Sequence, residues 1–360
     1  MSVSPITSSK GNGAPTDTLF KEHNFMACYH PNTALWYGDM TAAGKRKYYI
    51  IPQSGPTKTF GKLFSHYPLE EIEVPCGKCI GCRLDYSRQW ANRCMLEAKQ
   101  WQHNYMITLT YDESNVHLVD GVNRETGELQ KVGNLEPKDL TKFMKDLRRY
   151  YMYHYNHDNI RFYACGEYGD KTYRPHFHVI VFNCPILDLE NFFLNKEREQ
   201  IYLSNTISNI WNKGIITVAK LEWQVAAYVA RYVMKKRKGK DSEEYYKKLG
   251  VIPEFVRMSR SPGIARDYYE QHKDQIYEFD EIHLERKNGQ VMTVKPSKYY
   301  DRLYDLDSPE ALAAIKKQRK LAAEISLYNE LHKTNLNKVQ YLELKEKNKI
   351  AQTKTLLRTI

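Results

Sequence analysis

The chain has 360 residues, 42% hydrophobic and 27% charged, a balance typical of a folded globular protein and not of a disordered or fibrous one. Its 54 lysines and arginines exceed its 43 aspartates and glutamates, and the net charge of +11 favours a polyanionic partner such as nucleic acid. Uninterrupted apolar runs are too short to cross a bilayer, and the polar N-terminus lacks the apolar core of a secretory signal. We therefore expect a cytoplasmic protein whose seven cysteines are reduced.

The N-terminal part of the chain is short of helical periodicity. Residues 1–22 are polar and rich in Ser, Gly and Thr, which is typical of a disordered lead-in. Residues 23–104 form the next predicted unit, a cysteine-containing segment of irregular structure and short strands. This unit ends in a helix predicted over 83–103, where apolar residues recur at three- and four-residue steps.

Residues 105–240 form the predicted core. Read in order, its elements give β-α-β-β-α-β and a further helix. This is the split-βαβ pattern of ferredoxin-like or RRM-like α+β folds, with an antiparallel sheet and helices on one face. The expected elements are strands at 105–111, 160–167, 176–182 and 214–221, helices at 137–153, 189–211 and 222–237, and an excursion with a hairpin at 112–135.

The C-terminal third divides into a mixed basic segment over 241–308 and a charged extension over 309–360. The extension is rich in Lys, Glu, Ala and Leu, which predicts a largely helical structure. The arginines Arg257, Arg260 and Arg266 surround a Ser-Pro-Gly sequence that could grip DNA phosphates. For both regions, a solvated basic surface is the favoured interpretation.

Two histidines alternate on the strand predicted over 176–182. Successive side chains of a strand point to opposite faces, so His176 and His178 share one face and Phe177 takes the other. A turn after the preceding strand can bring the carboxylate of Glu167 beside them. Two imidazoles and a carboxylate leave positions open on Mg²⁺ or Mn²⁺ for a phosphate oxygen. Hydrogen-bonded histidines on a sheet surface are the alternative, and the nearby glutamate favours the metal site.

Two tyrosines lie four residues apart on the helix predicted over 222–237. Tyr228 and Tyr232 therefore share one helix face, and Lys235 and Lys236 follow one turn later. A phenol, whose ordinary pKa is about 10, is a weak nucleophile at neutral pH unless a metal ion or an ammonium group stabilises the developing charge. An amphipathic helix with a solvated basic end explains this segment alone. Combined with the histidine strand, the segment indicates attack on a phosphodiester.

Three motifs occur in order between Tyr105 and Lys236. They are Met106–Thr110 (Met-Ile-Thr-Leu-Thr), Cys165–Gly169 followed by Arg174–His178, and Tyr228–Lys235. As a set they resemble the replication initiation proteins of gokushovirus-type Microviridae bacteriophages, within the His-hydrophobic-His (HUH) endonuclease superfamily. The segment Val74–Asn92 also resembles this group, and the C-terminal third resembles it more loosely.

The resemblance implies a rolling-circle replication initiator that nicks and rejoins single-stranded origin DNA by metal-assisted tyrosine transesterification. It implies that Glu167, His176 and His178 bind the catalytic Mg²⁺ or Mn²⁺. It also implies a 5′-phosphotyrosyl intermediate, a free 3′ hydroxyl that primes a host polymerase, and phage DNA and host replication proteins as partners.

The same resemblance gives the tyrosine helix its roles. Tyr228 and Tyr232 would be the two nucleophiles, and Lys235 the helix lysine. The neighbouring cations Arg231, Lys236 and Arg237 would contact DNA. Arg231 stands where the family often has lysine, which keeps the charge but changes its shape.

Three cysteines have the C-x2-C-x2-C spacing with which glycine-containing turns bring thiolates onto one ion. These are Cys76, Cys79 and Cys82, and either Cys28 or His30 offers a fourth ligand. A structural Zn²⁺ at this position would tie the irregular N-terminal segment to the core. An iron–sulfur site has similar spacing, but nothing in the sequence calls for electron transfer. Reduced cysteines in a tight turn are the alternative.

Other functions fit parts of the pattern. A zinc-stabilised single-stranded-DNA-binding protein without chemistry would use the same basic surface, and many of the 28 tyrosines could stack on unpaired bases. An HUH transposase usually has one nucleophile, and a relaxase places its tyrosine before the histidines. A phosphoesterase with paired His-x-Ser/Thr motifs would need two such segments. The sequence favours the replication nickase, with the binding protein and the transposase as alternatives.

Overall fold

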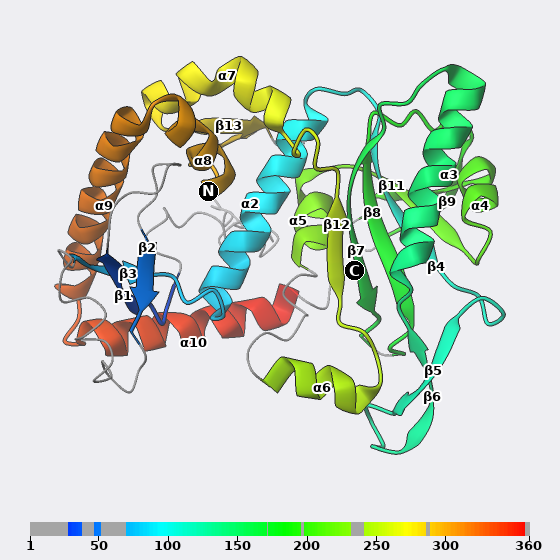
Figure 1. Cartoon of the computed structure of the whole chain (residues 1–360), viewed down its shortest axis with the longest axis horizontal. Helices are drawn as coiled ribbons and strands as arrows, with labels where there is room; N and C mark the ends of the chain where they lie inside the picture. The colour runs from blue at the N-terminus through cyan, green and yellow to red at the C-terminus, as the bar shows by residue number, and fades with distance from the viewer. Residues whose placement is uncertain are drawn as a thin grey trace, which may run out of the picture.

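A seven-stranded antiparallel sheet, in the order β12-β7-β8-β4-β11-β10-β9, forms the centre of the molecule (Figure 1). The computed structural model describes residues 28–37, 47–51, 70–170, 172–195, 198–231, 241–285 and 289–356. The strands of the sheet are β4 (Asn104–Thr110), β7 (Arg161–Tyr168), β8 (Pro175–Phe182), β9 (Leu189–Leu194), β10 (Gln200–Ser204), β11 (Ile216–Lys220) and β12 (Phe255–Met258).

The four central strands and two helices make two interleaved βαβ units. The first unit runs β4–α3–β7 and the second β8–α4–β11, with α3 at Pro137–Tyr155 and α4 at Asn205–Trp211. Each unit is split, because β8 lies between β4 and β7 while β4 lies between β8 and β11. The predicted α+β class is confirmed, and the predicted excursion after β4 forms the hairpin of β5 (His117–Val122) and β6 (Leu129–Asn134).

Helices cover both faces of the sheet, so the prediction of helices on one face is wrong. Figure 1 shows α3 and α4 on one side, with α2 (Ile80–Ala98) and α5 (Trp223–Arg231) on the other. The reason lies in β8, which is apolar on both faces. Phe177 packs in the core beside α3, whereas Ile180 and Phe182 pack in the core beside α2 and α5, and all three are fully buried. A strand with two apolar faces needs cover on both.

The helix predicted over 189–211 is also wrong. This segment forms the β9–β10 hairpin and only then the short helix α4. In the turn, the amide nitrogen of Glu199 donates to the side-chain oxygen of Asn195 at 2.8 Å, a typical asparagine turn. The Ser204 hydroxyl accepts from the amide of Ile207 at 3.1 Å and caps α4. These two local bonds interrupt the apolar periodicity that suggested one helix.

The N-terminal region contributes a separate sheet of short strands, as predicted. Its order is β2-β1-β3, and α2, which follows it, is the helix predicted over 83–103. The strands are β1 (Asn32–Tyr37), β2 (Lys47–Ile50) and β3 (Glu70–Val74). The predicted lead-in over 1–22 lies outside the described residues.

The C-terminal third encloses the N-terminal sheet and α2. After residue 309 the described chain is largely helical, as predicted, and α10 lies beside β1–β3 and α2 (Figure 1). Lys338 on α10 pairs with Glu73 on β3 at 2.6 Å. The elements are α6 (Asp241–Leu249), α7 (Arg266–Phe279), β13 (Ile282–Glu285), β14 (Val291–Val294), α8 (Lys298–Asp307), α9 (Pro309–Leu331) and α10 (Lys338–Leu356).

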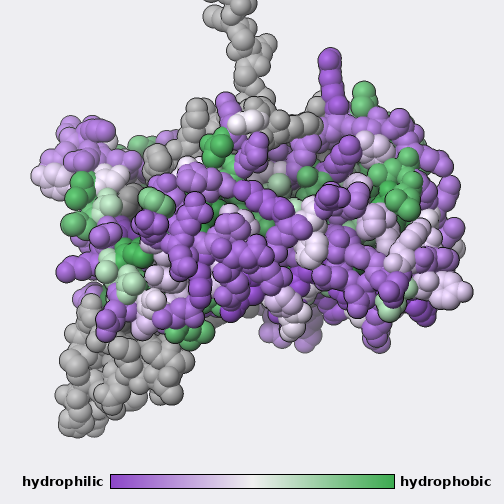
Figure 2. Space-filling model, turned by 90° about the horizontal axis from the view of Figure 1, so that it is seen from above, coloured by the Kyte–Doolittle hydropathy of each residue, from purple (hydrophilic) through white to green (hydrophobic). Residues whose placement is uncertain are grey.

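The arginines of the basic segment make contacts within the protein. Arg257 donates to the Thr141 hydroxyl on α3 at 2.6 Å, and Arg266 pairs with Glu270 one turn along α7. The face of the molecule in Figure 2 is mainly hydrophilic, and its apolar residues gather in small groups. Among the described helices, none combines the length and apolarity needed to span a bilayer.

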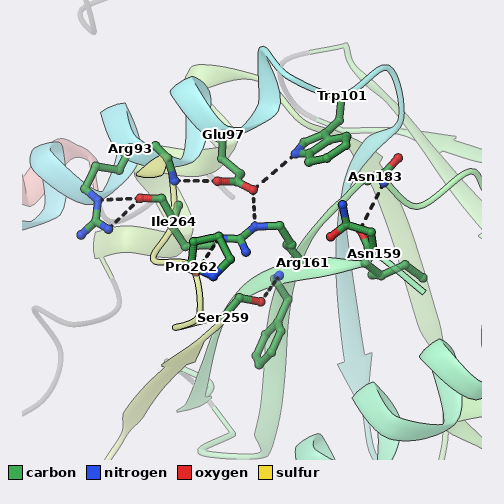
Figure 3. Close-up of polar contacts among 12 residues, drawn as sticks. Arg93, Glu97, Trp101, Asn159, Arg161, Asn183, Ser259, Pro262 and Ile264 are labelled. Carbon is green, nitrogen blue, oxygen red and sulfur yellow. Dashed lines mark hydrogen bonds and ion pairs between the residues drawn. The ribbon is translucent and has the colours of Figure 1, made fainter. Parts of the chain in front are cut away.

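A buried ion pair ties α2 to the sheet (Figure 3). Arg161, the first residue of β7, donates to the Glu97 carboxylate on α2 at 2.5 Å, and both side chains are at most 7% exposed. Glu97 also accepts from the Trp101 indole at 3.3 Å. Arg161 donates in addition to the carbonyl of Pro262 at 2.8 Å, and Arg93 donates to that of Ile264 at 2.7 Å. The network joins α2, the start of β7 and the loop before α7.

Candidate active site

Glu167, His176 and His178 converge on one point of the sheet, and we call them the histidine centre. In the β7–β8 ladder, Glu167 is the register partner of His176. The Nε2 atoms of His176 and His178 lie 2.6 and 3.2 Å from the same carboxylate oxygen of Glu167. One ligand atom of each residue lies within 4.8 Å of the others. The period-two alternation predicted from sequence therefore brings the three side chains together.

The histidine centre is largely shielded from water. Glu167 is 1% exposed and His178 5%. Burial alone would raise the pKa of Glu167, but the hydrogen bonds and positive charge offered by His176 and His178 outweigh it and lower the pKa to about 2. The carboxylate is therefore ionised at neutral pH and needs a positive partner in its buried position.

Each imidazole is oriented through its second nitrogen. The Nδ1 atom of His176 lies 3.1 Å from the carbonyl oxygen of Arg174, and the Nδ1 atom of His178 lies 3.0 Å from the hydroxyl of Thr108. A hydrogen bond at Nδ1 directs Nε2 toward the centre, the arrangement common around protein metal ions. Sequence analysis missed Thr108, although it lies in the Met106–Thr110 motif, because its place beside His178 depends on the β4–β8 register.

The donor set of the histidine centre fits a divalent cation. Two imidazole nitrogens and one carboxylate oxygen point at a common volume and are held there by the sheet and by outer hydrogen bonds. Three protein ligands leave coordination positions free for water or a substrate oxygen, which is typical of catalytic sites and not of structural ones.

Helix α5 brings Tyr228 to the histidine centre. The rings of Tyr228 and His178 are 5.4 Å apart between centroids, at an angle of 76°. The helix lies close to α2 and the sheet because its inner face carries the fully buried alanines Ala226 and Ala230. The Trp223 indole donates to the Asn92 side chain of α2 at 2.9 Å and fixes the start of α5.

The environment of Tyr228 disfavours its ionised form. Burial raises the pKa of the phenol well above its usual value, and the negative charge of Glu167 adds to this effect. Arg231, one turn later on α5, opposes it. At neutral pH the phenol is protonated, so its use as a nucleophile requires positive charge close to the oxygen.

Four residues predicted to act on this helix lie outside the described residues. They are Tyr232, Lys235, Lys236 and Arg237. Their roles as second nucleophile, helix lysine and DNA contacts stay predictions.

The four cysteines predicted to bind zinc also meet in space. The sulfur atoms of Cys28, Cys76, Cys79 and Cys82, which we call the cysteine centre, all lie within 4.8 Å of one another. His30, the alternative fourth ligand, lies 2.5 Å from Glu346 on α10 instead.

Comparisons with known proteins follow the same core. The family model for the phage replication-associated protein ORF2 matches residues 104–237, which contain the histidine centre and Tyr228. The replication-associated protein ORF2 of Spiroplasma virus 4 is 37% identical over 288 residues, covering 78% of this chain and 84% of the relative. This chain belongs to the phage replication-associated protein family.

Two further phage replication-associated proteins are similar to it. VP4 of the Bdellovibrio phage phiMH2K is 30% identical over 246 residues, covering 67% of this chain and 70% of the relative. ORF4 of Chlamydia phage 1 is 35% identical over 167 residues, covering 45% and 38%. No solved structure matches the chain. The predicted resemblance to phage replication proteins is confirmed, and the protein has a role in phage DNA replication.

Proposed function

We propose that this protein initiates rolling-circle replication by nicking and rejoining single-stranded origin DNA with tyrosine. The observation that carries the proposal is the contact between the Tyr228 ring and His178, a member of a buried centre of two imidazoles and a carboxylate. A nucleophile and a set of metal ligands within reach of one phosphate are the two parts that this chemistry needs.

In the proposed reaction, Glu167, His176 and His178 hold Mg²⁺ or Mn²⁺, which when bound draws negative charge from an oxygen of the scissile phosphate. Glu167 contributes a carboxylate that is ionised at neutral pH. The Arg174 carbonyl and the Thr108 hydroxyl keep both imidazoles facing the centre.

Tyr228 then attacks phosphorus. A bond forms between the phenol oxygen and phosphorus, the bond from phosphorus to the 3′ oxygen breaks, and the phenol proton leaves while the 3′ oxygen gains one. The products are a 5′-phosphotyrosyl link and a free 3′ hydroxyl, which primes a host polymerase. Because the phosphodiester is exchanged and not hydrolysed, the strand can be rejoined later. Arg231 favours the negative charge that develops on the phenol.

Tyr232 is proposed as the second nucleophile, which cuts after one round while Tyr228 holds the first end, and Lys235 assists. Arg231, Lys236 and Arg237 contact the DNA backbone. Phage origin DNA and the host helicase and polymerase are the proposed partners, and the host cytoplasm is the proposed place of action.

A denaturing gel tests the proposal. A labelled single-stranded oligonucleotide that contains the phage origin is incubated with Mn²⁺ and wild-type protein, Tyr228→Phe, Tyr232→Phe or both changes together. We expect a protein–DNA adduct that survives denaturation, impairment of the full cycle by each single change, and loss of the adduct in the double variant. An undiminished adduct in the double variant would refute the assignment. DNA binding without any cleavage by the wild type would instead support a non-catalytic binding protein.

A further inference from the structure

The cysteine centre joins three parts of the chain that are far apart in sequence. Cys28 precedes β1, Cys76 follows β3, and Cys79 and Cys82 belong to the start of α2. Cys28 is 2% exposed and Cys79 9%, and all four are free thiols. Four thiols crowded in one place offer little packing advantage over ordinary apolar side chains, so the arrangement itself calls for an explanation.

Backbone amides point at the sulfur atoms. Those of Lys78 and Cys79 donate to the sulfur of Cys76 at 3.4 and 3.3 Å, and that of Cys76 donates to the sulfur of Cys28 at 3.2 Å. Two more, from Tyr29 and Cys82, donate to the sulfur of Cys79, both at 3.4 Å. Amide donors of this kind stabilise thiolates, which are better acceptors than thiols.

The separations of the sulfur atoms suit a tetrahedral ion. Four sulfurs at about 2.3 Å from Zn²⁺ would lie roughly 3.8 Å apart. All four sulfurs of the cysteine centre are already within 4.8 Å of one another, so sub-ångström to ångström shifts complete the tetrahedron. Gly77 has a φ of +71°, the left-handed conformation that glycine adopts at no steric cost, and this turn brings Cys76 back toward Cys79.

We propose that Cys28, Cys76, Cys79 and Cys82 bind one structural Zn²⁺ as four thiolates. Four thiolates close the coordination sphere, which leaves no position for a substrate and separates this site from the histidine centre. The start of α2 adds the positive end of the helix dipole beside Cys79, whose sulfur caps the helix.

Helix α2 links the zinc site to the tyrosine helix. It begins beside Cys79 and packs against α5, where Asn92 accepts the hydrogen bond of Trp223. Zinc would therefore fix the N-terminal sheet and one end of α2, and through α2 the seat of α5. Its role is to position this scaffold, without contact to DNA.

Metal analysis of the purified full-length chain tests the proposal, with no metal added during purification. We expect about one zinc per chain in the wild type, in a His176→Ala/His178→Ala double variant, and in the control Cys94→Ala, whose cysteine is buried on α2 outside the centre. Cys79→Ser should lose most of the zinc. Retention of zinc in the histidine variant distinguishes this proposal from metal binding at the proposed active site.

A second measurement on wild-type protein covers the case in which Cys79→Ser fails to fold. Alkylation followed by mass spectrometry should leave the half-buried Cys76 and Cys82 unmodified until a chelator removes the metal. Cobalt in place of zinc should give the absorption of tetrahedral thiolate coordination. Wild-type protein without zinc, iron in its place, or zinc lost only from the histidine variant would each overturn the proposal.

Discussion

The histidine centre and the cysteine centre are built in opposite ways. The first stands on two neighbouring strands, and its ligands are set by pairing across the β7–β8 ladder. The second is made from two loops and a helix start, and its donors come from segments 48 residues apart. The first offers three donors of nitrogen and oxygen, the second four sulfurs.

The difference separates two uses of a metal ion. An incomplete set of nitrogen and oxygen ligands on a rigid sheet suits exchange of water for a phosphate oxygen. A complete set of thiolates holds its ion permanently and replaces the hydrophobic packing that a segment of short strands lacks. We therefore expect changes at the histidine centre to affect the reaction rate, and changes at the cysteine centre to affect folding.

The largest expected effect separates these two outcomes. Glu167→Gln removes a buried negative ligand, so cleavage with Mn²⁺ should slow by about 10³-fold or more, while oligonucleotide affinity and melting temperature stay close to those of the wild type. Cleavage of the labelled oligonucleotide and its binding by fluorescence anisotropy are measured together. A variant that cleaves at more than a tenth of the wild-type rate would remove Glu167 from the reaction.

The next effect concerns the helix that connects the two centres. Glu97→Ala leaves the guanidinium of Arg161 buried without its carboxylate, which should lower the free energy of unfolding by about 3–5 kcal/mol. Glu324→Ala is the matched control, because its pair with Lys320 spans 4.0 Å on an exposed face and is worth about 0.3–0.5 kcal/mol. Urea unfolding measures both, and equal losses would contradict the scaffold role of α2.

A smaller effect is expected behind the histidine ligands. Thr108→Val removes the hydroxyl at the Nδ1 atom of His178, which should weaken Mn²⁺ binding and slow cleavage by about 10–100-fold. Thr217→Val is the control, because Thr217 is the register partner of Thr108 on β11, one strand further from His178. Manganese titration of cleavage gives both values. Similar behaviour of the two variants would show that the hydroxyl does not orient His178.

The smallest effect is expected where α10 touches the N-terminal sheet. The pair Lys338–Glu73 is formed by side chains that are 40% and 43% exposed, so Lys338→Ala should change the free energy of unfolding by no more than about 1 kcal/mol. Removal of zinc by a chelator should destabilise the same region far more. If the thermal unfolding shifts of the two are equal, the cysteine centre does not hold this region together.

Local patterns made the active-site ligands predictable. His176 and His178 follow from strand alternation, and Glu167 from the hairpin that pairs β7 with β8. Features that depend on long-range pairing were not predictable, namely the contact of Thr108 with His178 and the choice of Cys28 over His30. The β9–β10 hairpin was missed because the side-chain bonds of Asn195 and Ser204 override apolar periodicity. The division of the chain into five units stays a prediction.

The most direct test of the central claim is to identify the residue that DNA modifies. Wild-type protein is incubated with circular single-stranded phage DNA and Mn²⁺, the DNA is digested, and the peptide that carries the remaining nucleotide is sequenced by mass spectrometry. We predict a phosphodiester link to Tyr228 or Tyr232, formed only when Glu167, His176 and His178 are intact. A link to a residue outside this helix, or one that forms equally well in a His176→Ala variant, would contradict the account.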